Sequence, residues 1–198
     1  MDQPAILILG IGNILWADEG FGVRVVQSLQ QSYAFPPSIT LMDGGTQGLA
    51  LMPYVQQADI LIIIDAVDFQ LNPGTLVELH DAEVPAYLGA NKMSLHQVSF
   101  QEVLVLSQLL GQCPDRLVLI GVQPETLEDY GGSLTAAVKS QITAAMDRVL
   151  AYLALLGIHT GLKTPISDQP KAASGMDEYE RLRPSARAAC RIGDSRFL

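Results

Sequence analysis

Residues 6–22 read ILILGIGNILWADEGFG, and this stretch decides the fold. It opens with an uncharged apolar run rich in β-branched residues, which is typical of a strand buried on both faces. The run ends in a turn around Gly10 and Gly12, because glycine permits positive φ and the close approach of another chain. Asp18 and Glu19 follow where a helical pattern begins. We therefore predict a buried strand that delivers acidic side chains to the carboxyl edge of an α/β sheet, where ligands bind in such folds.

Strand and helix patterns alternate along most of the remaining chain. Buried-type strands are predicted at 39–42, 60–64 and 117–122, a half-buried antiparallel strand at 75–80, and helices at 22–31, 49–57, 99–111 and 133–156. Ser99 with Glu102 forms a capping-box pattern, and Ser133 is a second predicted helix cap. Residues 84–94 have no clear period and are predicted as loop. The fold class is therefore α/β, a three-layer sandwich in which a twisted, mostly parallel sheet has helices on both faces.

The pattern of alternating strands and helices ends at residue 157. Residues 1–157 are predicted as a single α/β domain, and residues 158–198 as a mobile C-terminal tail.

The whole chain has a net charge of −9, and the first 157 residues hold 16 of its 21 acidic side chains but only 5 of its 12 basic ones. An acidic body argues against nucleic acid or an anionic membrane as partner.

Other features of the sequence indicate a cytoplasmic protein. No apolar run reaches the roughly 18 residues that a membrane-spanning helix needs. The first residues are not basic, so no signal peptide is expected. Cys113 and Cys190 lie far apart without metal-type spacing, which is typical of reduced thiols in the cytoplasm.

Three of the predicted strands lead to a carboxylate. Glu19 follows the first, Asp43 the second and Asp65 the third. Neighbouring parallel strands end at the same edge of a sheet, so these groups are expected to converge. Carboxylates in one crevice repel each other unless a proton or a cation offsets their charge. His96, in a polar segment before a helix, is the best placed of three histidines to complete an oxygen and nitrogen site for a transition metal.

Plainer interpretations stay open for each of these residues. An Asp at a strand end is often a helix cap or a turn former. A dinucleotide-binding motif at Gly10 and Gly12 is rejected, because Leu15 stands where the third glycine is required. Leu15 and Trp16 suit an apolar wall for a docking partner, and core packing is an equal alternative for Leu15. The residues alone thus indicate an α/β protein that binds a metal or another cation, with no reaction defined.

Several motifs together resemble those of a known family. The chain is similar to the maturation endopeptidases of nickel-iron hydrogenases, above all to the branch that serves membrane-bound uptake hydrogenases. The resemblance covers residues 5–157. It is carried, in order, by GIGNILWADEGFGVRVV, LMDGGTQGL, IIIDAVD, PGTLVELH, KMSLHQ and IGVQPETLEDYGGSLT.

The resemblance implies an activity and a site. It implies an aspartic-type, metal-dependent endopeptidase that removes the C-terminal extension of the hydrogenase large-subunit precursor after nickel insertion and recognises the bound nickel. The nickel would come with the substrate, and no organic cofactor is expected. The implied metal-contacting residues are Glu19, Asp65 and His96. The implied catalytic residues are Asp43, Glu19 and Asp65. The implied substrate-binding residues are Asp43, Gly44, Gly45 and Thr46.

The expected partner is the large-subunit precursor, with neither nucleic acid nor membrane, and the free protein is expected to be a monomer. One rival is a nickel-sensing chaperone that holds the precursor without cutting it. A second rival, a nucleotide-binding protein with its phosphate site at residues 10–13, is disfavoured by the acidic rim.

Overall fold

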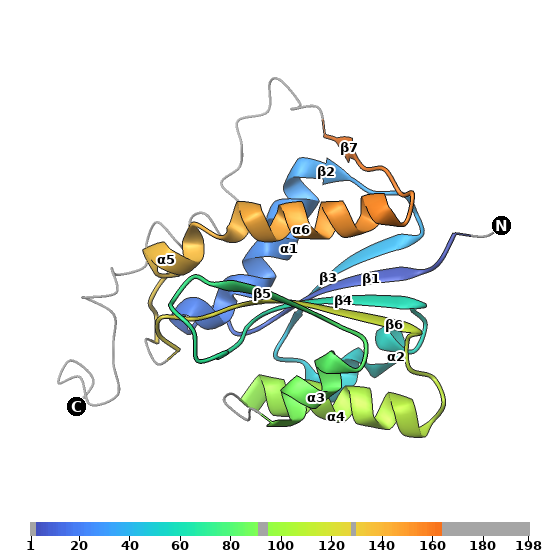
Figure 1. Cartoon of the computed structure of the whole chain (residues 1–198), viewed down its shortest axis with the longest axis horizontal. Helices are drawn as coiled ribbons and strands as arrows, with labels where there is room; N and C mark the ends of the chain where they lie inside the picture. The colour runs from blue at the N-terminus through green and yellow to red at the C-terminus, as the bar shows by residue number, and fades with distance from the viewer. Residues whose placement is uncertain (1–2, 91–94, 128–129, 164–198) are drawn as a thin grey trace.

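The computed structural model describes residues 3–90, 95–127 and 130–163. Five strands form one sheet in the order β3-β1-β4-β6-β5 (Figure 1). Four of them run parallel and β5 runs antiparallel to β6. Their bounds are β1 Ile6–Ile11, β3 Ile39–Gly45, β4 Ile60–Ala66, β5 Leu76–His80 and β6 Arg116–Val122. The predicted mostly parallel sheet with one antiparallel strand is confirmed.

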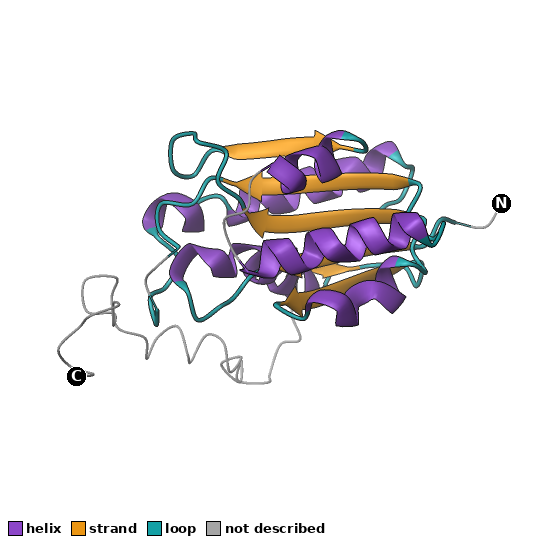
Figure 2. Ribbon diagram, turned by 90° about the horizontal axis from the view of Figure 1, so that it is seen from below, coloured by secondary structure: helices purple, strands orange, loops and turns teal. Residues whose placement is uncertain are grey.

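Helices cover both faces of this sheet (Figures 1 and 2). The first face carries α1 (Phe21–Ser32), α5 (Ala136–Lys139) and α6 (Ile142–Leu155). The second face carries the 3₁₀ helix η2 (Gly48–Leu51) with α2 (Met52–Val55), α3 (Glu83–Ala90) and α4 (Leu95–Leu109). Each face has its own hydrophobic cluster. The three-layer sandwich predicted from the sequence is therefore confirmed.

The central strand β4 shows why its sequence is continuously apolar. Ile60, Ile62 and Ile64 belong to the cluster under α1, whereas Leu61 and Ile63 belong to the cluster under α4. Side chains alternate between the faces of a strand, so both faces of β4 must be apolar to be buried. All seven residues of β4 are buried.

The predicted loop at 84–94 is wrong over most of its length. Residues 83–90 form α3, with Pro85 in the first turn, where a missing N–H costs no helical hydrogen bond. Val84 and Leu88 from this helix are buried in the second cluster. The next helix, α4, begins at Leu95, so Ser99 lies inside it and is not its cap.

The helix predicted at 133–156 is two helices, α5 and α6. The cap is Thr135 and not Ser133, because the Thr135 hydroxyl accepts a hydrogen bond from Val138 N at 3.4 Å. The chain then turns at Ser140 and Gln141 before α6 begins.

Two short strands that the sequence did not predict lie beside α1 and α6. β2 (Tyr33–Ala34) pairs antiparallel with β7 (Gly161–Leu162), and Ile158 before β7 is buried in the first cluster. The domain boundary at residue 157 stays a prediction, and residues 164–198 of the predicted tail lie outside the described residues. None of the described helices is long and apolar enough to cross a membrane.

Candidate functional site

Glu19 lies in the 3₁₀ helix η1 (Ala17–Gly20), just after the turn that ends β1. Trp16 N donates to Asn13 O at 3.0 Å, and Glu19 N donates to Trp16 O at 2.9 Å. Two successive tight turns therefore carry the chain from β1 to α1. They leave Glu19 half-buried on the wall of an open polar cavity of about 460 Å³.

Gly12 holds the main chain of Glu19 close to β4. Its φ is +125°, a conformation that residues with a Cβ rarely adopt. A Cβ on Gly12 would lie 1.7 Å from Glu19 O and 3.7 Å from Asp65 Oδ1. Gly12 thus separates the backbone of one predicted metal contact from the carboxylate of another. Because Gly12 has no side chain, η1 can approach the end of β1 closely.

Asp65 is the next-to-last residue of β4 and is only 2% exposed. Its Oδ1 accepts a hydrogen bond from Ala66 N at 2.8 Å. Because Ile64 belongs to the cluster under α1, strand alternation directs Asp65 to the opposite face, where α4 packs. A carboxylate at this depth is retained only with hydrogen bonds or a counter-charge.

His96 is the second residue of α4, so it lies on a helix and not in a loop. Its helix covers the face toward which Asp65 is directed. The His96 side chain lies outside the described residues. The meeting of Glu19, Asp65 and His96 therefore stays a prediction. Among the side chains that are described, no three from His, Cys, Asp and Glu are arranged to hold a metal ion.

Asp43 lies near the end of β3, opposite Gly10 of β1. Since β1 separates β3 from β4, strand spacing places its backbone about 10 Å from that of Asp65. The residue is exposed, but partial desolvation of its carboxyl group raises its pKa above the usual 3.8. Hydrogen bonds from Gly45 N–H and the Gln27 side chain oppose this rise in the pKa. Gln27 belongs to α1, so Asp43 is held from the first face of the sheet.

The turn after Asp43 is tied to β1. Gly44 is buried, and a Cβ there would lie 2.7 Å from Leu9 Cδ1. Gly45 has a φ of +47° and accepts a hydrogen bond from Gly12 N at 3.0 Å. Thr46 is exposed at the rim. The four predicted substrate-binding residues therefore form one continuous rim segment beside β1.

Asp18 supports the site, although the sequence does not distinguish it from its neighbour Glu19. It is fully buried, and its carboxylate accepts hydrogen bonds from three main-chain amides and one hydroxyl. The donors are Glu125 N (2.9 Å), Thr126 N (3.1 Å), Thr135 N (2.7 Å) and Thr135 Oγ1 (3.1 Å). Asp18 thus fixes the segment after β6 against η1. No local pattern reveals this role, because its partners lie more than 100 residues away.

Gln123 organises another part of the wall of the cavity beside Glu19. Its Oε1 accepts from Phe69 N at 2.7 Å and from Leu71 N at 3.1 Å, while its Nε2 donates to Asp68 Oδ1 at 2.9 Å. The side chain therefore joins the segment after β4 to the segment after β6. The cavity wall is built from the ends of two neighbouring strands.

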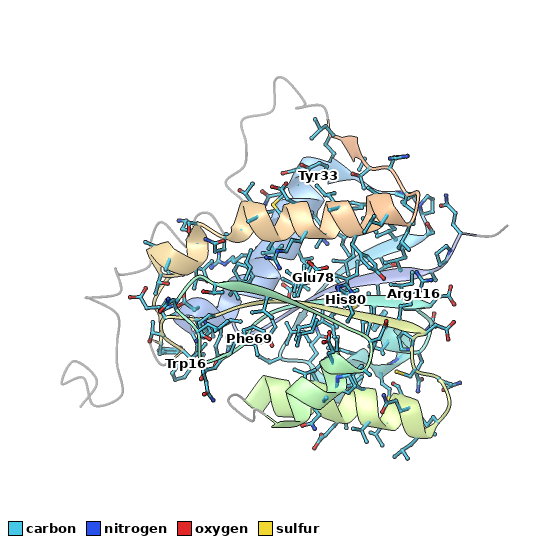
Figure 3. The ribbon with its side chains drawn as sticks, viewed as in Figure 1. Trp16, Tyr33, Phe69, Glu78, His80 and Arg116 are labelled. Atoms are coloured by element: carbon cyan, nitrogen blue, oxygen red, sulfur yellow. The ribbon has the colours of Figure 1, made fainter. Side chains whose placement is uncertain are left out.

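An aromatic pair stands at the same end of the molecule. Trp16 and Tyr130 form an edge-to-face contact with ring centroids 5.4 Å apart, and Gly131 N donates to Leu15 O at 2.7 Å. Figure 3 places Trp16 and Phe69 together at this end of the sheet. Leu15 is 37% exposed and Tyr130 is 47% exposed, so these two segments present apolar surface to solvent. This supports the interpretation of Leu15 and Trp16 as a wall at the surface.

These features define a class of protein. It is an α/β protein whose carboxylates gather at the carboxyl edge of a parallel sheet, on strand ends and on the turns that follow them. A family model described as hydrogenase maturation protease matches residues 23–152. The chain belongs to the hydrogenase maturation protease family, which makes it a peptidase.

Similar proteins agree with this membership. The chain is 53% identical over 194 residues to the hydrogenase expression/formation protein HupD of Rhodobacter capsulatus, covering 98% of this chain and 92% of that protein. It is 43% identical over 164 residues to the hydrogenase 2 maturation protease of Escherichia coli, covering 82% of this chain and 99% of that protein.

A solved structure has the same fold. The hydrogenase maturating endopeptidase HybD from E. coli matches with a TM-score of 0.76 and 42% identity, covering 80% of this chain and 97% of HybD. A hydrogenase 2 maturation peptidase from a Thaumarchaeota archaeon matches with a TM-score of 0.58 and 30% identity, covering 76% of this chain and 98% of that one.

Proposed function

We propose that this protein removes the C-terminal extension of a nickel-iron hydrogenase large-subunit precursor after nickel insertion, and that the bound nickel is its recognition signal. The family membership supports the peptidase activity, and relatives named for hydrogenase maturation support the substrate class. The reaction is proposed to take place in the cytoplasm.

The observation that carries the proposal is the approach of the Glu19 main chain to the Asp65 carboxylate across Gly12. Glu19 lies in η1 after the end of β1, Asp65 lies at the end of β4, and the helix that bears His96 covers the face toward which Asp65 is directed. Two carboxylates and an imidazole are a weak, open ligand set for nickel. Such a set can contact nickel already held by the precursor and then release it. A closed site of four protein ligands would retain the ion.

Asp43 is proposed to act separately from the nickel contact. Its backbone is about 10 Å from that of Asp65 by strand spacing. The two side chains are directed to opposite faces of the sheet, so the substrate must cross the carboxyl end of β1. An extended chain covers the backbone distance in about three residues, so nickel bound to the precursor and the scissile bond can occupy the two places together. A carboxylate with a raised pKa is a better general base for water. In this mechanism Asp43 takes a proton from the water that attacks the scissile carbonyl and returns it to the amine nitrogen as the peptide bond breaks. A carboxyl group thus acts as both base and acid, which is the chemistry of the aspartic-type class.

The proposal is tested with nickel-loaded and nickel-free precursor, each mixed with the enzyme and followed by mass spectrometry. We expect only the nickel-loaded precursor to be shortened. Asp65→Asn and His96→Ala should each slow cleavage by about 100-fold or more, and Asp43→Asn by a similar factor. Asp147→Ala, which removes an exposed carboxylate from α6, is the matched control and should cleave at the normal rate.

Two results would contradict the proposal. Normal cleavage by both Asp65→Asn and His96→Ala would exclude the nickel contact. A stable complex of enzyme and nickel-loaded precursor in which the precursor keeps its full mass would favour the non-cleaving chaperone.

A further inference from the structure

The strand β3 forms one edge of the sheet, and half of its main-chain groups face away from β1. Ile6 N donates to Ser38 O at 2.8 Å, which fixes the side of β3 that faces β1. Main-chain groups of successive strand residues point to opposite sides, so Leu41 and Asp43 direct their N–H and C=O groups outward. An outward row of this kind is the template to which another strand can pair.

Two glutamine side chains cover the outward carbonyl groups. Gln30 of α1 donates from Nε2 to Leu41 O at 3.1 Å, and Gln47 donates from Nε2 to Asp43 O at 3.4 Å. Both glutamines are exposed, and the second bond is long for a hydrogen bond. Within the described part of the chain, the amides of Leu41 and Asp43 have no hydrogen-bond acceptor. A side-chain carboxamide has the donor chemistry of a peptide group, so a peptide can replace both covers.

This edge leads directly to the rim segment at residues 43–46. From Thr40 to Asp43 the strand rises about 10 Å, the length of three residues of an extended peptide. A strand added along β3 therefore ends beside Asp43.

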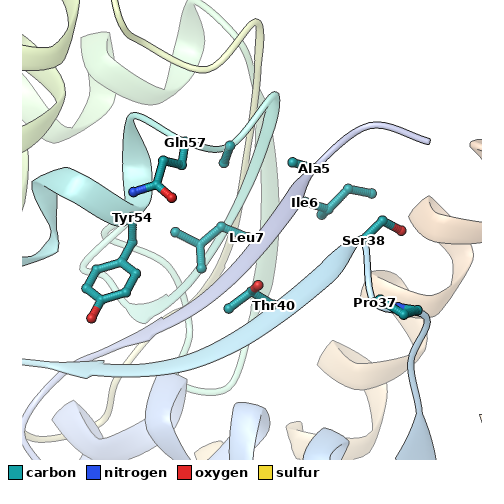
Figure 4. A pocket seen from close by; sticks show the side chains of 9 residues that line it. Ala5, Ile6, Leu7, Pro37, Ser38, Thr40, Tyr54 and Gln57 are labelled. Atoms are coloured by element: carbon teal, nitrogen blue, oxygen red, sulfur yellow. The ribbon is translucent and has the colours of Figure 1, made fainter. Parts of the chain in front are cut away.

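A second cavity lies at the other end of the same edge. It has a volume of about 210 Å³, and Figure 4 shows Thr40 of β3, Leu7 of β1 and Tyr54 of α2 among its lining residues. Leu7 is paired with Thr40 and belongs to the cluster under α2 and α4, which places this cavity on the second face of the sheet. Every second side chain of an added strand points to that face, where one of them can enter the cavity.

We propose that an extended segment of the precursor polypeptide adds to the outer edge of β3 as a sixth strand and displaces the Gln30 and Gln47 side chains. This inference rests on the proposed function. The occupant is expected to be a polypeptide, because the outward main-chain groups of β3 pair with a peptide backbone. It is expected to be the precursor, because this edge of the sheet leads directly to Asp43. Main-chain pairing gives affinity for any extended peptide, while the pockets for alternate side chains give selectivity.

Amide hydrogen exchange of the full chain tests the pairing directly. The probe is a synthetic peptide that spans the cleavage site of the precursor, and a second arm uses the nickel-loaded precursor itself. Binding should slow exchange at Leu41 and Asp43 by on the order of tenfold, since each amide gains a hydrogen bond. Exchange at Thr40 and Met42, whose amides already face β1, should change little. Absence of this alternating pattern with both probes overturns the inference.

Removal of the glutamine covers is the second test. In the double variant Gln30→Ala and Gln47→Ala, the KM for nickel-loaded precursor should fall about threefold or more, because the peptide no longer displaces two internal hydrogen bonds. The kcat should be unchanged. Gln31→Ala is the matched control, since the side chain of this exposed neighbour on α1 makes no hydrogen bond to the described residues of β3. An unchanged or raised KM in the double variant contradicts the inference.

The outcomes separate this inference from the proposed function. If nickel-loaded precursor is cleaved normally but the alternating protection is missing, the function stands and the sixth strand does not. If Leu41 and Asp43 become protected with rising enzyme concentration and no probe, a second copy of the chain occupies the edge, and the inference is wrong.

Discussion

At the scale of single residues, backbone geometry decides what the site tolerates, and Gly12 is the sharpest case. The variant Gly12→Ala would place a methyl group 1.7 Å from Glu19 O in addition to straining a φ of +125°. Backbone strain alone costs about 1–3 kcal/mol. We therefore expect Gly12→Ala to lower the free energy of unfolding by about 4 kcal/mol or more, because η1 must also move.

The control for this prediction is Gly157→Ala. Its φ is +75°, but no atom lies within 4 Å of the new Cβ, so strain acts there without a clash. Urea unfolding of the two variants separates the cost of backbone strain from the cost of the clash with Glu19. Equal losses in both would show that the close approach of Glu19 to Gly12 carries no cost of its own.

Asp43 gives a second prediction at this scale. Because desolvation raises its pKa in the folded protein above 3.8, the folded state holds the proton more tightly than the unfolded state. The contribution of Asp43 to stability is therefore full below pH 3.8 and is lost as the pH rises through the raised pKa. Relative to Asp43→Asn, the wild type should lose stability over this interval and then level off. Urea unfolding from pH 3 to pH 7 checks the sign, and the opposite slope would show that the hydrogen bonds outweigh desolvation.

At the scale of elements, the segments at the carboxyl edge are joined by hydrogen bonds to the buried carboxylate of Asp18. Asp18→Ala would leave the amides of Glu125, Thr126 and Thr135 without their acceptor. An unsatisfied buried donor costs about 1–3 kcal/mol. These three donors are partly buried, so each falls at the lower end of that range, and we expect a loss of about 3 kcal/mol in the free energy of unfolding. Asp147→Ala on α6 should change it by less than about 0.5 kcal/mol.

Hydrogen exchange shows whether that loss is local. Residues 125–127 and the start of α5 should exchange faster in Asp18→Ala, while β4 keeps its protection. Uniform acceleration over the sheet would mean that Asp18 stabilises the whole fold and not these segments alone.

The elements also show how far the sequence predicts the structure. The buried strands and their edge were predictable, because continuous apolar runs have few alternatives in an α/β chain. Helix α3 was missed because Pro85 and Gly89 resemble loop residues, whereas burial of Val84 and Leu88 against the sheet stabilises the helix.

Predictions for the site were limited by contacts between distant parts of the chain. The strand-end positions of Asp43 and Asp65 could be predicted from local pattern. The division of roles between Asp18 and Glu19 depends on partners beyond residue 120. The contact of Trp16 with Tyr130 depends on the same distant segment, so neither feature has a local signal.

At the scale of the whole molecule, the predicted end of the domain at residue 157 can be compared with the packing of the next six residues. Ile158 is 5% exposed within the cluster under α1 and α6. Beyond it, β7 pairs with β2, and Lys163 N donates to Ser32 O at 3.0 Å. These contacts close the first face of the sheet beside the C-terminal end of α1.

Two shortened chains test this boundary. A chain ending at Lys163 should keep the melting temperature of the full chain, because it retains Ile158 and β7. A chain ending at Gly157 exposes part of the first cluster and loses about 2–3 kcal/mol for the buried isoleucine alone. For a domain of this size, such a loss lowers the melting temperature by roughly 4–12 °C, as calorimetry would measure. If both shortened chains melt together with the full chain, the domain ends at residue 157 as predicted. If both melt lower, residues beyond 163 belong to the folded unit.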